Sequence, residues 1–185
     1  MPSSSTLDMR RQLLDAALTV LRRDGAEGLT VRHVAVEAGC STTGIYTHFG
    51  GKQGLVEAIF LEGFDSFDEA LLPLYEKGDV LAAGRTYRTW ALANPTHYLV
   101  MFGRAVPDFT PSEPAMERAN RSFAALVEAV GGHTGVTDPM IAAYHLYATV
   151  HGYVMLELID MGPVGTADRD SLYESGLLAA LAGLS

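Results

Sequence analysis

Residues 30–52 constrain the fold more than any other stretch of this 185-residue chain, because they encode two short helices joined by a tight turn. The apolar residues of the first half have the i, i+3, i+4 spacing of one helical face: Val31, Val34 and Ala35. Thr30 precedes them and can cap the helix with its hydroxyl. Gly39 can take the left-handed conformation that ends a helix, and Ser41 is a suitable cap for the next one. The stretch therefore predicts a pair of helices with a turn at Gly39.

The second helix of the pair has one apolar face and one small, polar face. Ile45 and Phe49 are four residues apart and are expected to point inward. The other side chains would face solvent: Thr42, Thr43, Gly44, Tyr46, Thr47 and His48. Hydroxyl groups bind phosphates and base edges, and threonine methyls can contact the methyl group of thymine. A rod of this kind fits the major groove of DNA; the alternative is an ordinary helical hairpin with a solvated face.

The residues around this helix pair resemble the N-terminal DNA-binding domain of the TetR family of transcriptional regulators, over about residues 10–64. The matching residues are Leu29-Thr30-Val31, Val34-Ala35, Ala38-Gly39, Ser41, Gly44-Ile45-Tyr46, His48-Phe49, Lys52 and Leu55. The resemblance implies that the threonines at the start of the second helix face bases or backbone, and that Tyr46, His48 and Lys52 hold phosphates. We therefore expect the DNA-binding residues to be Thr30, Arg32, Ser41, Thr42, Thr43, Gly44, Tyr46, Thr47, His48 and Lys52.

Three residues depart from the family pattern. Cys40 stands where the family usually has an aliphatic residue, and Gly51 replaces the usual capping residue before Lys52. His33 cannot complete a capping box with Thr30. We interpret Cys40 as a small buried apolar residue; the alternative is a redox switch at the turn of the helix pair.

The formal net charge of −9 is unfavourable for binding nucleic acid, but it is distributed unevenly. Residues 1–52 carry six basic and five acidic side chains, which gives +1 and leaves −10 for the rest of the chain. One end of the chain can therefore approach phosphate while the other is acidic. Because the positive charge is thin, we expect modest nonspecific affinity that falls with salt.

Composition places the chain among globular proteins, because 48% of its residues are apolar. No window approaches the roughly 18 apolar residues of a membrane span. The first six residues lack the charged and apolar regions of a signal peptide and are expected to form a short polar arm. A single cysteine excludes an internal disulfide and suits a reducing cytoplasm, where we expect the protein to act without a membrane partner.

Helical periods and helix breakers along the chain predict an all-α fold of about nine helices in two parts. The first helix is expected at residues 7–24, ended by Gly25, and the fourth at residues 51–72, ended by Pro73. The later helices are expected at residues 80–93, 95–102 (capped by Asn94), 113–130, 139–161 (ended by Gly162-Pro163) and 167–184. We assign residues 1–52 to a three-helix helix-turn-helix DNA-binding bundle with an arm at 1–6, and residues 53–185 to a ligand-binding and dimerisation domain.

The helix expected at residues 139–161 is apolar almost all round, so it must be covered on several sides. Ala148 and Gly152, four residues apart, would permit another helix to approach closely. Two copies of this helix and of the helix at residues 167–184 can form a two-fold four-helix contact. We therefore expect a homodimer through the last two helices; a buried core helix in a monomer is the alternative.

Residues 80–160 also resemble the C-terminal part of one TetR subgroup, through Trp90, then Asn94-Pro95, then His151-Gly152. Large side chains in this region could line a cavity for a small apolar ligand: Trp90, Tyr98, Met101, Phe102, Tyr144, Tyr147, His151 and Met155. The alternative is that they fill the core. His145 and His151 are six residues apart, not the three or four that place two ligands on one helical face, so no metal site is expected.

The resemblance implies a homodimeric, sequence-specific repressor that binds a palindromic operator and is released by a small-molecule effector. Its recognition helices would enter the major groove about one helical turn apart, ~34–36 Å. A metal- or redox-responsive regulator on the same scaffold is the first alternative, and a small helical enzyme is the second. Because the chain has no Gly-rich phosphate loop, no HExxH motif and no nucleophile elbow, we expect neither catalytic residues nor a cofactor.

Overall fold

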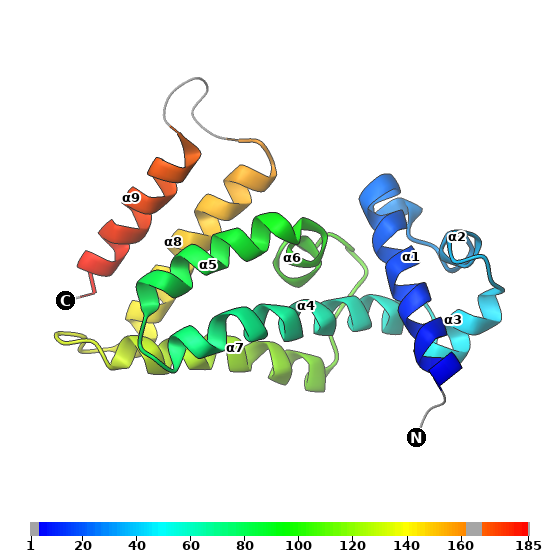
Figure 1. The fold of residues 1–185 in the computed structure, drawn as a ribbon, viewed down its shortest axis with the longest axis horizontal. Coiled ribbons are helices and arrows are strands. Elements are labelled where there is room, and N and C mark those ends of the chain that lie inside the picture. The colour runs from blue at the N-terminus through cyan, green and yellow to red at the C-terminus, as the bar shows by residue number, and fades with distance from the viewer. Residues whose placement is uncertain (1–3, 162–167, 185) are drawn as a thin grey trace. The chain divides into compact units, whose positions relative to one another are not determined.

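The computed structural model describes residues 4–161 and 168–184, and Figure 1 shows the arrangement of their helices. Within these residues there are nine α-helices and no strand: α1 (Ser4–Gly28), α2 (Val31–Glu37), α3 (Thr42–Phe49), α4 (Lys52–Tyr75), α5 (Val80–Ala93), α6 (Pro95–Phe102), α7 (Glu113–Gly131), α8 (Pro139–Leu158) and α9 (Arg169–Ala182). The expected all-α class is confirmed. None of these helices is long and apolar enough to cross a membrane.

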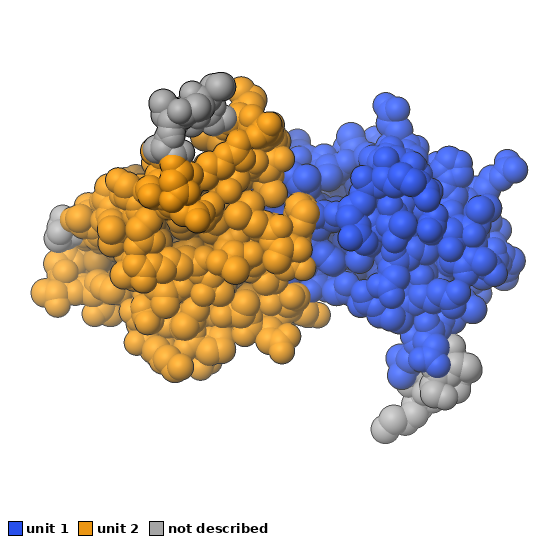
Figure 2. All heavy atoms as spheres, turned by 45° about the horizontal axis from the view of Figure 1, so that its top comes forward, with its two compact units in different colours: residues 1–63, 96–116 blue, residues 64–95, 117–185 orange. Residues whose placement is uncertain are grey.

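The chain forms two compact units, which Figure 2 shows in different colours. The first consists of residues 1–63 and 96–116, so it combines the first three helices and the start of α4 with α6 and the loop that follows it. The second consists of residues 64–95 and 117–185 and contains the rest of α4, α5, most of α7, α8 and α9. This division into two units reflects which residues pack together. The expected boundary after residue 52 instead separates a DNA-binding part from a ligand-binding and dimerisation part, and it stays a prediction.

The core of the first unit lies between α1, α2 and α3, which pack against one another. The apolar stripe of α1 is buried together with residues of the two short helices and the start of α4: Leu13, Leu14, Ala17, Val20, Leu21, Val34, Ala35, Ile45, Leu55 and Ile59. Gly25 has φ 68° and ψ −168°, so it breaks the helical path where the sequence predicts a stop, and a short turn continues to Gly28. This packing fixes α3 against its neighbours and leaves its other face exposed.

Two helix ends in this part of the chain differ from the sequence prediction. α1 begins at Ser4 and not at residue 7, so residues 4–6 of the expected arm are helical, while residues 1–3 lie outside the described residues. Pro73 does not end α4, which continues to Tyr75. A proline near the end of a helix removes only one hydrogen bond, and the fully buried Leu71 still anchors this turn.

The turn after α5 and the end of α8 also differ from the prediction. Asn94 is the C-cap of α5, and its side-chain amide donates to the carbonyl of Trp90 at 2.9 Å, a role that was not predicted; its capping of α6 stays a prediction. α8 ends at Leu158, before the predicted end at residue 161, because Asp160 has φ 54° and leaves the helical path. The predicted stop at Gly162-Pro163 lies outside the described residues.

In the second unit, α5, α8 and α9 pack against one another. A Cβ added to Gly84 on α5 would lie 2.5 Å from Cδ1 of Leu177, which is buried on α9. The hydroxyl of Tyr173 donates to the carbonyl of Gly84 at 2.5 Å. A Cβ added to Gly176 on α9 would lie 2.3 Å from the ring of Tyr153 on α8. Glycine therefore allows α9 to approach both of its neighbours closely.

Candidate nucleic-acid interface and effector region

The start of α2 is held by side chains as well as by backbone. Thr30 Oγ1 accepts a hydrogen bond from the backbone N–H of His33 at 3.1 Å, which confirms the predicted helix cap. Nδ1 of the His33 ring lies 2.8 Å from the carbonyl oxygen of Gly28. This second contact was not predicted, and it ties α2 to the end of α1 where a capping box is absent.

The turn between α2 and α3 uses left-handed glycine at the predicted place. Gly39 has φ 64°, and Gly50, which caps the end of α3, has φ 70°. Ser41 is the N-cap of α3 by position, but its side chain makes no capping hydrogen bond. Its exposed hydroxyl is therefore not engaged in holding the helix start.

α3 has one buried apolar position and a polar outer surface. Ile45 is fully buried, whereas Tyr46 is 59% exposed. The exposed residues are small or polar: Ser41, Thr42, Thr43, Tyr46 and Thr47. Gly44, His48 and Phe49 are half-buried, as is Lys52 at the start of α4. The outer surface thus presents hydroxyl and phenol groups, which bind phosphates and base edges.

Gly44 is not required by packing inside its own unit. A Cβ at this position would meet Cδ1 of Leu13 at 3.8 Å and Sγ of Cys40 at 3.9 Å, both ordinary contact distances. The fold therefore has room for alanine, which is about 1 kcal/mol more favourable than glycine in a helix.

The cations near the two short helices fall into two groups. Arg11 and Arg23 are paired with carboxylates of the same unit: Arg11 with Asp15 and Glu62, and Arg23 with Asp24 and Glu37. Arg10, Arg22, Arg32 and Lys52 form no ion pair with any residue that the structure describes. The thin positive charge counted along the sequence is thus reduced further by internal pairing.

Arg10 is a residue that the sequence patterns did not single out. Its guanidinium carbon lies 5.1 Å from the centroid of the Phe49 ring, at the C-terminal end of α3. No motif marks Arg10 in the sequence, because the contact joins residues of two helices that are far apart in the chain.

Glu62 on α4 joins α1 to α6 within the first unit. One carboxylate oxygen lies 2.7 Å from Nη1 of Arg11, and the other lies 3.2 Å from Nε2 of His97. The hydrogen bond to His97, together with the charge of Arg11, holds the pKa of Glu62 below its usual value. Two further hydrogen bonds of 2.7 Å hold the loop after α6 to α4, from the Gln53 amide to the Asp108 carbonyl and from the Ser112 N–H to Glu57.

Three of the predicted effector-contacting residues belong to one aromatic cluster in the second unit: Trp90, Tyr147 and His151. The rings of Tyr147 and His151 stack with their centroids 5.3 Å apart. The Tyr87 hydroxyl lies 3.3 Å from Nδ1 of His151, and the ring of Phe67 meets those of Tyr87 and Trp90 edge-on at 5.4 and 5.1 Å. Tyr87 and Phe67 complete the cluster and were not among the predicted residues.

The aromatic cluster is polar but without formal charge near neutral pH. Burial lowers the pKa of His151 and raises the pKa of Tyr147, so the imidazole is neutral and the phenol keeps its proton. The indole N–H of Trp90 donates to the hydroxyl of Ser66 at 3.0 Å. Aromatic faces with a few polar groups suit a small apolar ligand.

The other predicted effector residues are distributed differently. Tyr98, Met101 and Phe102 belong to the first unit, where the buried ring of Tyr98 lies 5.0 Å from that of Phe102. Tyr144 is 61% exposed on α8, and Met155 is half-buried. The eight residues therefore do not form a single group within one unit, and their role as a ligand set stays a prediction.

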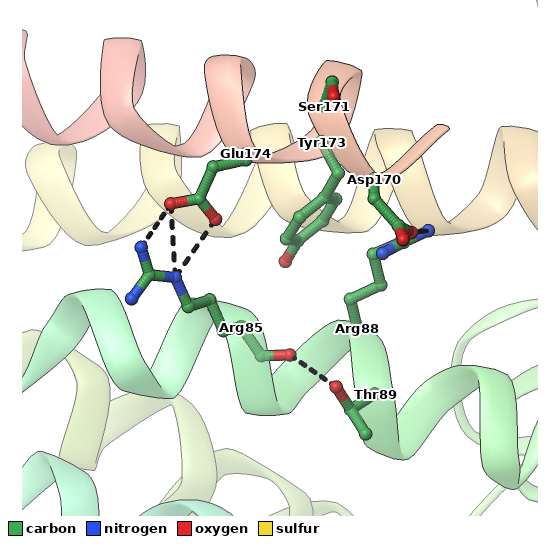
Figure 3. Close-up of a pocket in the computed structure, with 7 residues that line it drawn as sticks. All are labelled: Arg85, Arg88, Thr89, Asp170, Ser171, Tyr173 and Glu174. Atoms are coloured by element: carbon green, nitrogen blue, oxygen red, sulfur yellow. Dashed lines mark hydrogen bonds and ion pairs between the residues drawn. The ribbon is translucent and has the colours of Figure 1, made fainter. Parts of the chain in front are cut away.

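A polar pocket of about 380 Å³ lies between α5 and α9 (Figure 3). Its lining residues are Arg85, Arg88, Thr89, Asp170, Ser171, Tyr173 and Glu174. Arg85 binds both carboxylate oxygens of Glu174. Arg88 pairs with Asp170 at 2.6 Å and with Glu157 of α8 at 2.8 Å. Because both guanidinium groups are already matched by carboxylates, we interpret the pocket as a clamp that holds α5 to α8 and α9.

α8 carries a row of exposed apolar residues. Five of its residues, or residues just beyond its end, are between 49% and 61% exposed: Met140, Ile141, Tyr144, Leu156 and Ile159. Gly152 is half-buried, and a Cβ added there would meet nothing within 4 Å. The predicted all-round apolar helix thus has one covered side and one open side.

Cys40 was expected to be buried, but it is only half-buried, because it lies in the turn between α2 and α3. Its sulfur lies 3.5 Å from the carbonyl oxygen of Ser41. A redox role for Cys40 stays a prediction. Across residues 4–161 and 168–184, no three His, Cys, Asp or Glu side chains are grouped so that they could hold a metal ion.

Comparison with known families decides between the possible roles of this scaffold. Residues 13–59 match the family described as bacterial regulatory proteins, tetR family, and residues 80–180, more than half of the chain, match the tetracyclin repressor-like C-terminal domain. The chain belongs to the TetR family. This TetR-family protein is therefore a helix-turn-helix transcriptional regulator, and the resemblance seen in the sequence is confirmed. The narrower subgroup defined by Trp90, Asn94-Pro95 and His151-Gly152 stays a prediction.

Relatives of this TetR-family regulator are similar over different parts of its length. An uncharacterised HTH-type transcriptional regulator of Mycobacterium tuberculosis is 25% identical over 181 residues, which cover 95% of this chain and 81% of that protein. The HTH-type nicotine-responsive transcriptional repressor HdnoR of Paenarthrobacter nicotinovorans is 43% identical over 58 residues, 31% of this chain and 30% of the repressor. The crystal structure of the protein SCO4313 has the same fold, with a TM-score of 0.87 at 23% identity over 98% of this chain and 100% of that one.

Proposed function

We propose that this TetR-family regulator is a homodimeric repressor that binds a palindromic operator through α3 and is released by a small apolar ligand. The observation that carries the proposal is the orientation of α3, in which Ile45 is fully buried and Tyr46 is 59% exposed. Because its polar face is exposed, the helix can enter a major groove without rearrangement of its bundle. Repression is supported by 43% identity over 58 residues to a nicotine-responsive transcriptional repressor.

Within the proposed interface, Thr42 and Thr43 contact base edges or backbone. Tyr46, His48 and Lys52 bind phosphates on either side of the groove. The remaining contacts come from Thr30, Arg32, Ser41, Gly44 and Thr47. The two copies of α3 occupy half-sites about one helical turn apart, ~34–36 Å. We place this activity in the cytoplasm, and we assign the protein no catalytic role.

The proposed dimer forms through α8 and α9. The open apolar face of α8 contains Ile141, Tyr144 and Leu156, which a second copy would cover. Gly152 has open space around its Cα, so another helix can approach closely at this point. A two-fold four-helix contact buries this face and sets the separation of the two α3 helices.

The proposed ligand binds at the aromatic residues of the C-terminal domain. Trp90, Tyr147 and His151 supply rings and neutral polar groups in the second unit. A ligand favouring a conformer in which the two α3 helices no longer fit the half-sites would lower operator affinity. A coupling free energy of about 1–3 kcal/mol is typical of such regulation.

Selection of binding sites from a random duplex library, followed by footprinting, tests the operator part of this proposal. We expect enrichment of an inverted repeat whose half-sites are about one helical turn apart. Thr43→Ala should weaken binding, because it removes the hydroxyl and the methyl group that would contact a base edge or the backbone. Thr137→Ala, an exposed substitution in the second unit, should bind as the wild type does. Equal binding by both variants, or no enriched repeat, would contradict the proposal.

A screen of small apolar molecules by thermal shift tests the ligand part. We expect a compound that raises the melting temperature and also weakens operator binding. His151→Ala should reduce both effects together. A compound that raises the melting temperature but leaves operator affinity unchanged would contradict ligand-induced release.

A further inference from the structure

Arg10 and Arg11 are adjacent on α1, but their surroundings are opposite. Arg11 is matched by carboxylates, with Nη1 only 2.7 Å from Glu62 and a second pair to Asp15. Arg10 is exposed and forms no ion pair with the described part of the chain. One of the two cations is therefore neutralised by its own subunit, and the other keeps its full charge.

The side chain of Arg10 is directed to the end of α3. Its guanidinium carbon lies 5.1 Å from the centroid of the Phe49 ring, within the range of a cation–π contact. Phe49 is the last residue of α3, and the ring of His48 lies 6.3 Å from the ring of Phe49. The cation thus sits at the C-terminal end of the helix whose outer face carries the exposed hydroxyl groups.

A guanidinium group on an aromatic ring is oriented without being neutralised. A contact with the ring forms no ion pair, so the N–H donors of the guanidinium that do not point at the ring stay available. Those donors can still form paired hydrogen bonds to a phosphate, and the ring limits the conformations from which they do so. A lone surface arginine would lose more side-chain freedom on binding.

We propose that Arg10 binds a phosphate of the operator backbone and that Phe49 holds it in position at the end of α3. The inference rests on the proposed operator binding by α3, to which it adds a contact from α1. It also distinguishes Arg10 from Arg11, which the sequence presents as an equivalent pair.

The dependence of operator affinity on salt measures this contact directly. Each phosphate contact contributes about 0.9 to the slope of log affinity against log salt concentration. Arg10→Gln should make this negative slope shallower, by about one unit per bound subunit. It should also weaken binding uniformly across operator sequences. Arg10→Lys should keep most of the slope because it keeps the charge, and Phe49→Leu should lower affinity with little change in slope.

The matched control is Arg121→Gln, which removes one exposed positive charge from α7 in the second unit. It should leave the slope at the wild-type value, and circular dichroism of every variant should show an intact fold. If Arg10→Gln changes the slope no more than Arg121→Gln does, while the wild type binds its operator, the phosphate contact is wrong and the proposed function stands. If the wild type shows no salt-dependent operator binding, both the Arg10 contact and the proposed function are contradicted.

Discussion

At the scale of single residues, burial decides the charge of His151. Burial lowers its pKa below the usual value of about 6.5, so the folded protein keeps the imidazole neutral while the unfolded chain takes up a proton. As the pH falls from about 6.5 toward the folded pKa, the unfolded state binds more protons, and the free energy of unfolding decreases. We expect His151→Gln to remove this part of the pH dependence, as measured by urea unfolding at neutral and mildly acidic pH. Parallel curves for the wild type and the variant would contradict the burial of a neutral imidazole.

Gly44 separates what the fold needs from what the interface needs. Since a Cβ there has no contact closer than 3.8 Å, Gly44→Ala should raise the free energy of unfolding by up to about 1 kcal/mol. We expect the same substitution to weaken operator binding, because the bare backbone of glycine lets α3 approach the duplex more closely. Thermal melting and a mobility-shift titration of one preparation measure both effects. A variant that gains stability and keeps its operator affinity would show that Gly44 is not part of the DNA interface.

The burial of Ile45 and the exposure of Tyr46 on α3 could be predicted from the sequence, because they follow from the helical period. Phe49, which was expected to point inward, and Gly44 and His48, which were expected to face solvent, are all half-buried. The different surroundings of Arg10 and Arg11 could not be predicted, because they depend on Phe49 and Glu62, which lie on other helices. The helical period of a sequence indicates on which side of its helix a side chain lies. It does not indicate which residue of another helix that side chain contacts.

At the scale of helices, close approach of α5 and α9 depends on Gly84. A Cβ there would lie 2.5 Å from Cδ1 of Leu177, whose side chain is buried. Gly84→Ala should therefore lower the free energy of unfolding by about 1–3 kcal/mol, although alanine is the better helix former. Chemical unfolding measures the change, and Gly44→Ala is the matched control, in which the same added methyl group meets its neighbours only at ordinary contact distances. A Gly84→Ala protein as stable as the wild type would show that α9 can shift without cost.

Helix bounds were predictable where breakers are strong and local. α5 and α6 begin and end at the predicted residues, because Asp79 caps one helix and Pro95 opens the other. Pro73 misled the prediction, because a proline close to the end of α4 costs one hydrogen bond while Leu71 stays packed. The early end of α8 could not be predicted either, because it depends on the left-handed backbone of Asp160, and few non-glycine residues adopt that conformation.

At the scale of the whole molecule, the uncovered face of α8 predicts the assembly state. Ile141 and Leu156 are 55% and 49% exposed in the single subunit, so charges placed there should not disturb its fold. We expect the double variant Ile141→Glu, Leu156→Glu to be monomeric by analytical ultracentrifugation, with unchanged helical content. It should also lose most of its affinity for a full inverted repeat, because each half-site would be bound separately. A double variant that sediments as a dimer would place the subunit contact elsewhere.

Internal pairing of Arg11 and Arg23 has a consequence for the behaviour of the protein on a chromosome. Attraction between unpaired cations and phosphate supplies essentially all binding to DNA of random sequence. A regulator that has already matched several of its arginines spends less of its time on the roughly 10⁶–10⁹ irrelevant sites of a genome. Fewer copies per cell are then needed to keep the target site occupied.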